Sequence, residues 1–342
     1  MLDLAVIGAG PCGLAVGVAA KRAHLTCTLY DKGPVVASLL RYPLYGTFFS
    51  TPDKLEIGVP FVIAGDKPTR REALSYYRKV AEYFELDVRQ YHTVRRVARR
   101  RGEHAFEIEA EHPGMPGPET IGARHVVFAT GYFESPNRLG VPGEDLPNVS
   151  HYFVEAHPYW QQRVVVVGGG NSAVETALEL CRVGAEVTMV HFLGDFDRGV
   201  KPWILPDITN RVKEGRVRVR WCSRVVEVAR SHVIVRRESA GEEEGEGQGE
   251  RETIPADFVL ALTGYTADLT VLRSVGVTVD ESSGVPSHSP ATMETNVPGV
   301  YIAGVLASGF DANKIFIENG REHGGRICEH IKSKPPRVAP GG

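Results

Sequence analysis

The sequence predicts an α/β protein built from two copies of one strand–turn–helix unit. An apolar run at 4–7 leads into a glycine-rich turn at 8–13 and a helix to about Arg22, and a second run at 164–167 leads into a turn at 168–173 and a helix to about Arg182. Both turns have the pattern G-x-G-x-x-G/A, whose glycines let the backbone approach a pyrophosphate at a helix N-terminus. We therefore expect two Rossmann-like dinucleotide-binding domains.

The residue that ends the second strand of each unit suggests which nucleotide binds. Asp31 and His191 lie equally far past the first glycine of their turns (31 − 8 = 23 and 191 − 168 = 23). A carboxylate at this place holds a ribose hydroxyl and repels a 2′-phosphate, so the first unit should bind an unphosphorylated adenine dinucleotide. His191 imposes no such repulsion, and Arg198 and Lys201 follow it, which favours NADP(H) in the second unit. The alternative for His191 is a half-exposed residue at a strand end.

Each unit then continues through a predicted β-meander. The meander tips lie at 111–119 and 239–252, and each unit closes with an apolar strand and Thr-Gly-Tyr, at 130–132 and 263–265. The arginine-rich stretch 95–101 is predicted to be an exposed strand face. The first unit is longer by a Pro- and aromatic-rich stretch at about 34–67, and such an insertion beside a cofactor site is typical of a functional loop. We expect it to line the redox ring of the first dinucleotide.

The last strand should return to the first unit, because Thr-Gly-Tyr already closes the second one. It runs over 296–304 and leads into a helix predicted from Lys314 to His330. The second unit is then an insertion, with predicted domains at 1–155 plus 290–332 and at 156–289, and a flexible tail at 333–342. Two linkers, near 149–162 and 285–295, could act as a hinge.

Composition excludes several classes of function. The chain has 342 residues, 39 Lys plus Arg against 42 Asp plus Glu, and a net charge of −3, so it has no basic field for nucleic acid. It has no apolar run long enough for a membrane helix and no signal peptide. The five cysteines are scattered, without CxxC or metal-ligand spacing, which favours a reduced, cytoplasmic protein without a metal. No hydrolase, zincin or P-loop motif is present.

The double turn, the paired Thr-Gly closures and the return strand resemble the two-dinucleotide-binding-domain flavoproteins, such as low-molecular-weight thioredoxin reductase. That resemblance implies FAD on the first unit and NADPH on the second. Longer stretches look like the bacillithiol disulfide reductase (YpdA-type) family: GAGPCG at 8–13, FFSTPDKLEIG at 48–58, KPWILP at 201–206, and IAGVLASG at 302–309 with Asn313 and IFIENGR at 315–321. Two positions depart from the expected patterns. Val305 replaces the Asp of the wider superfamily, and Phe192 stands where the narrower family commonly has Arg.

These arguments give a set of candidate cofactor contacts. Those for FAD are Gly8, Gly10, Pro11, Cys12, Gly13, Asp31, Lys32, Phe49, Ser50, Thr130, Gly131, Gly304, Asn313 and Ile315. Those for NADPH are Gly168, Gly170, Asn171, Ser172, Ala173, His191, Arg198, Lys201 and Gly264.

Cys12 is the candidate catalytic residue, with two interpretations open. A helix N-terminus stabilises a thiolate by about 0.3–1 kcal/mol, whereas a neighbouring pyrophosphate opposes ionisation. Cys12 could simply be the small residue that packs beside the third glycine. In the resembling family a cysteine here is proposed as the active thiol. The hypothesis is that Cys12 attacks a low-molecular-weight disulfide and is released by electrons from reduced FAD. The other four cysteines are predicted to be structural.

The expected partner is therefore a small-molecule disulfide, bacillithiol disulfide by resemblance, with no nucleic acid or membrane, and the resemblance also implies a homodimer. A carrier that passes electrons to a protein, as ferredoxin–NADP reductase or thioredoxin reductase does, remains open. A flavin monooxygenase and a redox sensor without turnover are weaker alternatives. The KPWILP segment suggests either a lid on the nicotinamide side or a turn with a buried Trp203.

Overall fold

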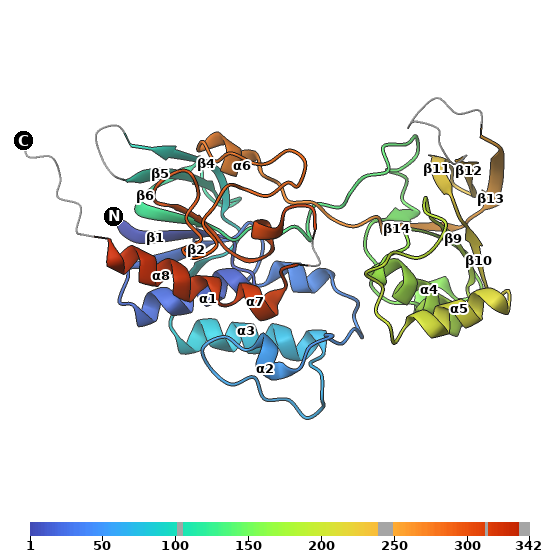
Figure 1. Cartoon of the computed structure of the whole chain (residues 1–342), viewed down its shortest axis with the longest axis horizontal. Helices are drawn as coiled ribbons and strands as arrows, with labels where there is room; N and C mark the ends of the chain where they lie inside the picture. The colour runs from blue at the N-terminus through green and yellow to red at the C-terminus, as the bar shows by residue number, and fades with distance from the viewer. Residues whose placement is uncertain (101–104, 239–248, 312–313, 335–342) are drawn as a thin grey trace, which may run out of the picture. The chain divides into compact units, whose positions relative to one another are not determined.

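The chain folds into two compact units, which we describe separately. In the computed structural model, residues 1–100, 105–238, 249–311 and 314–334 are described. Unit 1 comprises residues 1–40, 45–135 and 266 onward, and unit 2 comprises residues 41–44 and 136–265. Unit 2 is thus inserted into the sequence of unit 1 (Figure 1). Within the described residues, no helix combines the length and apolar character that crossing a membrane requires.

Unit 1 is built on a seven-stranded sheet with the order β3-β2-β1-β6-β5-β4, in which β15 also pairs with β6. Strands β1, β2, β3 and β15 belong to its parallel part, and β4, β5 and β6 form an antiparallel meander. β6 belongs to both parts: its first half pairs with β5 in the meander, and its second half pairs with β1 and β15 in the parallel part. The bounds are β1 (Leu2–Ile7), β2 (Cys27–Tyr30), β3 (Asp87–Arg89), β4 (Thr93–Arg99), β5 (Phe106–Glu111), β6 (Glu119–Phe128) and β15 (Val300–Ile302).

Helices of unit 1 pack on this sheet and on one another. α1 and α8 lie side by side (Figure 1), and a β-carbon on Gly324 of α8 would lie 2.7 Å from the backbone oxygen of Ala15 in α1, so only glycine allows this approach. α3 begins with a capping box between Thr69 and Glu72. The bounds are α1 (Pro11–Arg22), α2 (Pro52–Leu55), α3 (Arg70–Tyr83), α6 (Thr270–Ser274), α7 (Ile317–Gly320) and α8 (His323–Ser333), with 3-10 helices η1 (Ala37–Arg41) and η3 (Gly304–Ser308).

Unit 2 has a parallel sheet with the order β10-β9-β8-β14-β7 and an antiparallel sheet with the order β11-β12-β13. One apolar cluster packs the parallel sheet against helices, and a second, rich in valine, lies between the two sheets. The bounds are β7 (Val149–Ser150), β8 (Arg163–Val167), β9 (Glu186–Val190), β10 (Val217–Arg220), β11 (Ser223–Val228), β12 (His232–Arg237), β13 (Arg251–Pro255), β14 (Phe258–Ala261), α4 (Asn171–Val183) and α5 (Leu205–Lys213), with the 3-10 helix η2 (His157–Tyr159).

The predicted fold class is confirmed, including both meanders and the return of β15 to the sheet of unit 1. The continuous helix expected from Lys314 to His330 is wrong, since α7 and α8 are separate. Glycines lower helix propensity there, and Gly320 packs against Cys12. Of the predicted meander tip at 239–252, residues 239–248 lie outside the described residues, and β13 begins at Arg251. Of the predicted tail at 333–342, Ser333 ends α8 and residues from 335 lie outside the described residues.

The compact units divide at other places than the predicted domains. Residues 266–289 fall in unit 1, because α6 packs against β4, and residues 136–155 fall in unit 2. The chain crosses between the units at 135–136 and at 265–266 rather than near 155 and 290. In unit 2, the N–H of Asn137 donates to the oxygen of Gly264, so the entering and leaving segments are bonded to each other.

Candidate functional site

The first glycine-rich turn connects β1 to α1. Gly8 has φ +108°, and a β-carbon there would lie 2.3 Å from the oxygen of Ala129, while one on Gly13 would lie 2.0 Å from the oxygen of Gly8. These two glycines are therefore required by the chain itself. Gly10 has no atom within 4 Å of an added β-carbon, and α1 has no side-chain cap at its N-terminus. The turn leaves space beside a helix N-terminus that no side chain caps, which fits a pyrophosphate.

Asp31 fastens this turn to the end of β2. Its Oδ2 accepts from the N–H of Ala9 at 2.7 Å, and its Oδ1 accepts from the N–H of Gly33 at 2.8 Å. Burial raises the pKa of this carboxyl, and the two backbone hydrogen bonds oppose that rise. Lys32 pairs with Glu134 at 2.9 Å, so its charge already has a partner within unit 1.

The predicted FAD residues gather at one edge of the sheet. Gly8 follows β1, Asp31 follows β2, Thr130 and Gly131 follow β6, and Gly304 follows β15. These four strands are parallel, so their carboxyl ends meet at the same edge, where α/β sheets bind ligands. Of the remaining candidates, Phe49 is exposed, Ser50 and Ile315 are partly buried, and Asn313 lies outside the described residues.

Cys12 lies in the first turn of α1 and packs against two glycines. A β-carbon on Gly304 would lie 3.1 Å from the Sγ of Cys12, and one on Gly320 would lie 2.8 Å from it. Desolvation, with a smaller contribution from Glu318, raises the pKa of Cys12 from 9.0 to about 12. That rise corresponds to roughly 4 kcal/mol, which outweighs the helix-dipole contribution of about 0.3–1 kcal/mol. In this arrangement Cys12 is a thiol.

Two residues outside the set of predicted contacts also belong to this region: Glu318, which lies in the quoted stretch 315–321, and His323, which lies in none of the quoted stretches. Glu318 of α7 accepts a short hydrogen bond from the hydroxyl of Ser50, which ties the insertion at 34–67 to α7. His323 opens α8 and accepts a hydrogen bond from the N–H of Gly304. The first contact links two of the stretches quoted from the sequence, 48–58 and 315–321, whereas no sequence pattern predicts the contact of His323 with Gly304.

The second turn is built similarly in unit 2. Gly168 has φ +133°, and a β-carbon there would lie 2.4 Å from the oxygen of Leu262. The Asn171 side chain accepts from the N–H of Lys201 and donates to the oxygen of Gly199, both at 2.9 Å, so it holds the following loop against the turn. Of the other NADPH candidates, Ser172 and Arg198 are exposed, Ala173 is buried, and Gly170 and Gly264 lie at the turn and after β14.

His191 is buried, with 2 % of its surface exposed, so the half-exposed alternative is wrong. A β-carbon on Gly169 would lie 2.4 Å from its Nε2, so the imidazole packs directly under the turn. Its Nε2 lies 3.2 Å from the Oδ1 of Asp197, and desolvation lowers the pKa of His191 despite that carboxylate. The ring is neutral in this environment. Arg198, which is exposed, and Lys201 follow His191 in the chain.

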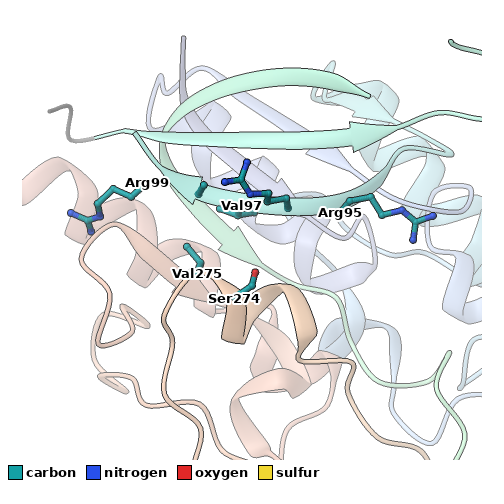
Figure 2. A pocket seen from close by; sticks show the side chains of 7 residues that line it. Arg95, Val97, Arg99, Ser274 and Val275 are labelled. Carbon is teal, nitrogen blue, oxygen red and sulfur yellow. The ribbon is translucent and has the colours of Figure 1, made fainter. Parts of the chain in front are cut away.

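A pocket lined by arginines lies at β4, the edge strand of the sheet in unit 1, and contains none of the predicted site residues. Figure 2 shows its lining from β4 and from the end of α6: Arg95, Arg96, Val97, Ala98, Arg99, Ser274 and Val275. Arg95 and Arg96 are paired with Glu111 and Glu109, each at 2.7 Å. β4 is an edge strand with exposed arginines, as predicted for this stretch.

Comparison with known proteins identifies the family of the chain. A family model described as pyridine nucleotide-disulphide oxidoreductase matches residues 5–304. The bacilliredoxin reductase Bdr of Bacillus subtilis is 43% identical over 330 residues, covering 96% of this chain and 97% of that protein.

Solved structures agree as well. The bacillithiol disulfide reductase Bdr (YpdA) of Bacillus cereus is 39% identical with a TM-score of 0.91, and the chains are covered to 97% and 99%. That of Staphylococcus aureus is 39% identical with a TM-score of 0.87 and the same coverage. The thioredoxin reductase of T. acidophilum, at 21% identity and a TM-score of 0.74, shares the fold.

These matches confirm the predicted enzyme class, an oxidoreductase that uses FAD and NADPH, and the expected resemblance. The chain belongs to the pyridine nucleotide-disulphide oxidoreductase family.

Proposed function

We propose that this chain reduces a low-molecular-weight disulfide of the bacillithiol type with electrons from NADPH. The observation that carries the proposal is the thiol of Cys12 within the first glycine-rich turn, at the carboxyl edge of the sheet in unit 1. The names of the relatives at 39–43% identity support this substrate.

The two turns divide the cofactors between the units. We assign FAD to unit 1, with its pyrophosphate beside Gly10 and α1, and NADPH to unit 2, beside Gly170 and α4. When bound, FAD accepts two electrons from NADPH and supplies them to a disulfide. The glycines of each turn admit the backbone to the pyrophosphate, and Asp31 places a negative charge where a ribose hydroxyl can donate.

Cys12 is assigned the role of the single thiol. Its Sγ attacks one sulfur of the substrate, forms a mixed disulfide and releases the first thiol. Two electrons from NADPH and one proton then break the mixed disulfide, which releases the second thiol and leaves Cys12 as a thiolate. The thiolate takes up a proton and the resting thiol is restored. Because the resting thiol has a raised pKa, the attack needs a proton acceptor, and Glu318 is the carboxylate whose charge acts on Cys12. The other cysteines are elsewhere: Cys27 begins β2 at the opposite edge, Cys181 and Cys222 belong to unit 2, and Cys328 lies within α8.

The test is Cys12→Ser, assayed without oxygen with NADPH and bacillithiol disulfide. The variant should still allow NADPH to bleach the flavin, and it should release no thiol in turnover. Cys222→Ser, in unit 2, is the matched control and should keep both steps. Full thiol release by Cys12→Ser would remove Cys12 from the mechanism.

A carrier that hands electrons to a protein is the second candidate. The raised pKa of Cys12 favours it, because such a route needs no thiol. Ferredoxin–NADP reductases at 25–26% identity are among the matching proteins. NADPH oxidation with bacillithiol disulfide, thioredoxin, ferredoxin and oxygen as separate acceptors discriminates the two. Turnover with ferredoxin and none with the small disulfide would favour the carrier.

We also propose a cytoplasmic homodimer. The support is the resemblance given above together with five free cysteines, which suit a reducing compartment. Light scattering on the purified protein measures its mass, and a monomer at micromolar concentration would contradict the dimer.

A further inference from the structure

The inference concerns His323, a buried residue that the chemistry above does not use. His323 is the first residue of α8 and has 5 % of its surface exposed. Its Nδ1 accepts a hydrogen bond of 3.1 Å from the N–H of Gly304, 19 residues earlier. Because Gly304 donates, Nδ1 carries no proton, and the ring is neutral with its proton on Nε2.

That hydrogen bond joins the two ends of a segment, from Gly304 to His323, whose glycines 304 and 320 lie beside Cys12. After β15 the chain passes through η3 and α7 before α8 begins. Gly304, at the start of this segment, has φ +73° and packs against Cys12, and Gly320, near its end, packs against the same sulfur. Gly304 and Gly320 also touch, since a β-carbon on Gly320 would lie 3.1 Å from the Cα of Gly304. Two neighbours of the thiol are thus glycine backbone, which has no side chain of its own to pack against the surroundings.

The environment of His323 keeps this acceptor available. Burial, together with smaller contributions from the charges of Arg326 and His288, lowers the pKa of His323 to about 4. The imidazole therefore stays neutral near pH 7, and Nδ1 remains an acceptor. The bond also occupies the amide of Gly304, so this amide is not free to donate to a cofactor.

We propose that His323 is a positioning residue that holds the backbone of Gly304 against Cys12 and thereby sets the access of reagents and substrate to that thiol. That a change of access alters turnover rests on the proposed role of Cys12. That His323 controls access to the Cys12 thiol does not rest on it, and this part can be measured without turnover.

The experiment compares His323→Leu with His323→Asn in the flavin-loaded protein. Leucine fills the space and removes the acceptor, whereas the Oδ1 of asparagine lies close to the position of Nδ1 and preserves it. Each protein is treated with iodoacetamide under native conditions, and alkylation of each cysteine is followed by peptide mass spectrometry. Cys328, buried in unit 1, is the internal reference, because unfolding of that unit would expose it as well.

We expect alkylation of Cys12 to become about tenfold faster in His323→Leu, which corresponds to about 1.4 kcal/mol and lies within the cost of leaving a buried donor unsatisfied. Alkylation of Cys328 should not change, and His323→Asn should behave as the unsubstituted protein. An unchanged rate at Cys12 in His323→Leu, or an equal acceleration in both variants, would overturn the proposal.

A second measurement covers the case in which His323→Leu does not fold. In the unsubstituted protein, hydrogen exchange of the Gly304 amide should be slow, as expected for a buried bonded N–H. Fast exchange at Gly304 would overturn the hydrogen bond on which the inference depends. In turnover, His323→Leu should change kcat for the disulfide and leave the KM for NADPH unchanged, and an NADPH effect alone would contradict positioning at Cys12.

Discussion

Replacing Gly10 by alanine separates binding of the cofactor from folding of the turn. An added β-carbon at Gly10 meets no atom of the chain within 4 Å, and its φ of −70° suits any residue. The same change at Gly13 places a β-carbon 2.0 Å from the oxygen of Gly8. The two substitutions add the same methyl group three residues apart, so they form a matched pair.

The expected magnitudes follow from these distances. For Gly10→Ala, the lower entropy of the unfolded chain contributes about 0.4–1 kcal/mol of stability and the poorer cap opposes it, so the free energy of unfolding should change by less than about 1 kcal/mol. For Gly13→Ala, overpacking should cost about 1–3 kcal/mol or more. If the space beside Gly10 binds the FAD pyrophosphate, the methyl group of Gly10→Ala takes up the space that the pyrophosphate needs. The lost hydrogen bonds to a charged group should then weaken FAD binding at least about 100-fold.

The assay measures stability and affinity on the same preparations. Urea unfolding of the flavin-free proteins gives the free energy of unfolding, and titration with FAD gives the dissociation constant. Gly10→Ala should unfold like the unsubstituted protein and bind FAD poorly. FAD affinity within about threefold of the unsubstituted protein would refute the assignment of this space to the pyrophosphate, since that corresponds to less than about 1 kcal/mol.

Three further predictions concern other parts of the chain. Arg198→Ala should raise the KM for NADPH about tenfold and leave that for NADH unchanged in steady-state assays, because an exposed cation there faces the proposed 2′-phosphate; equal effects on both would contradict this. The pKa of Asp257 is lowered to about 2 by hydrogen bonds from Arg163, so the stability it contributes is present above the unfolded pKa near 3.8 and is lost as the pH falls toward 2. Asp257→Asn should therefore lower the urea midpoint at pH 7 and converge with the unsubstituted protein in acid. Thr69→Ala should cost about 1 kcal/mol of unfolding free energy by removing the capping box with Glu72; an unchanged midpoint would show that α3 does not need it.

Local patterns made most of the fold predictable. The strand, turn and helix of each dinucleotide motif are adjacent in the chain, and their glycines carry a steric requirement that residue identity reveals. The return of the last strand followed from the closure of the second unit. The position of Asp31 was predictable from spacing, and its contacts with Ala9 and Gly33 place it beside the turn.

Long-range contacts and desolvation could not be predicted in the same way. The raised pKa of Cys12 depends on burial by distant segments, so the helix-dipole argument from the sequence alone missed the larger effect. The hydrogen bond between His323 and Gly304 joins two segments that no local pattern relates. The break between α7 and α8 follows Gly320, which packs on Cys12 from a distant part of the chain.

The most direct test of the account is an oxygen-free assay that follows flavin absorbance, NADPH oxidation and thiol release together, with bacillithiol disulfide as acceptor. The account predicts a yellow protein that NADPH bleaches, that the disulfide restores, and that releases two thiols for each NADPH oxidised. A preparation that is colourless and takes up no FAD, or a bleached flavin that bacillithiol disulfide leaves bleached, would contradict it.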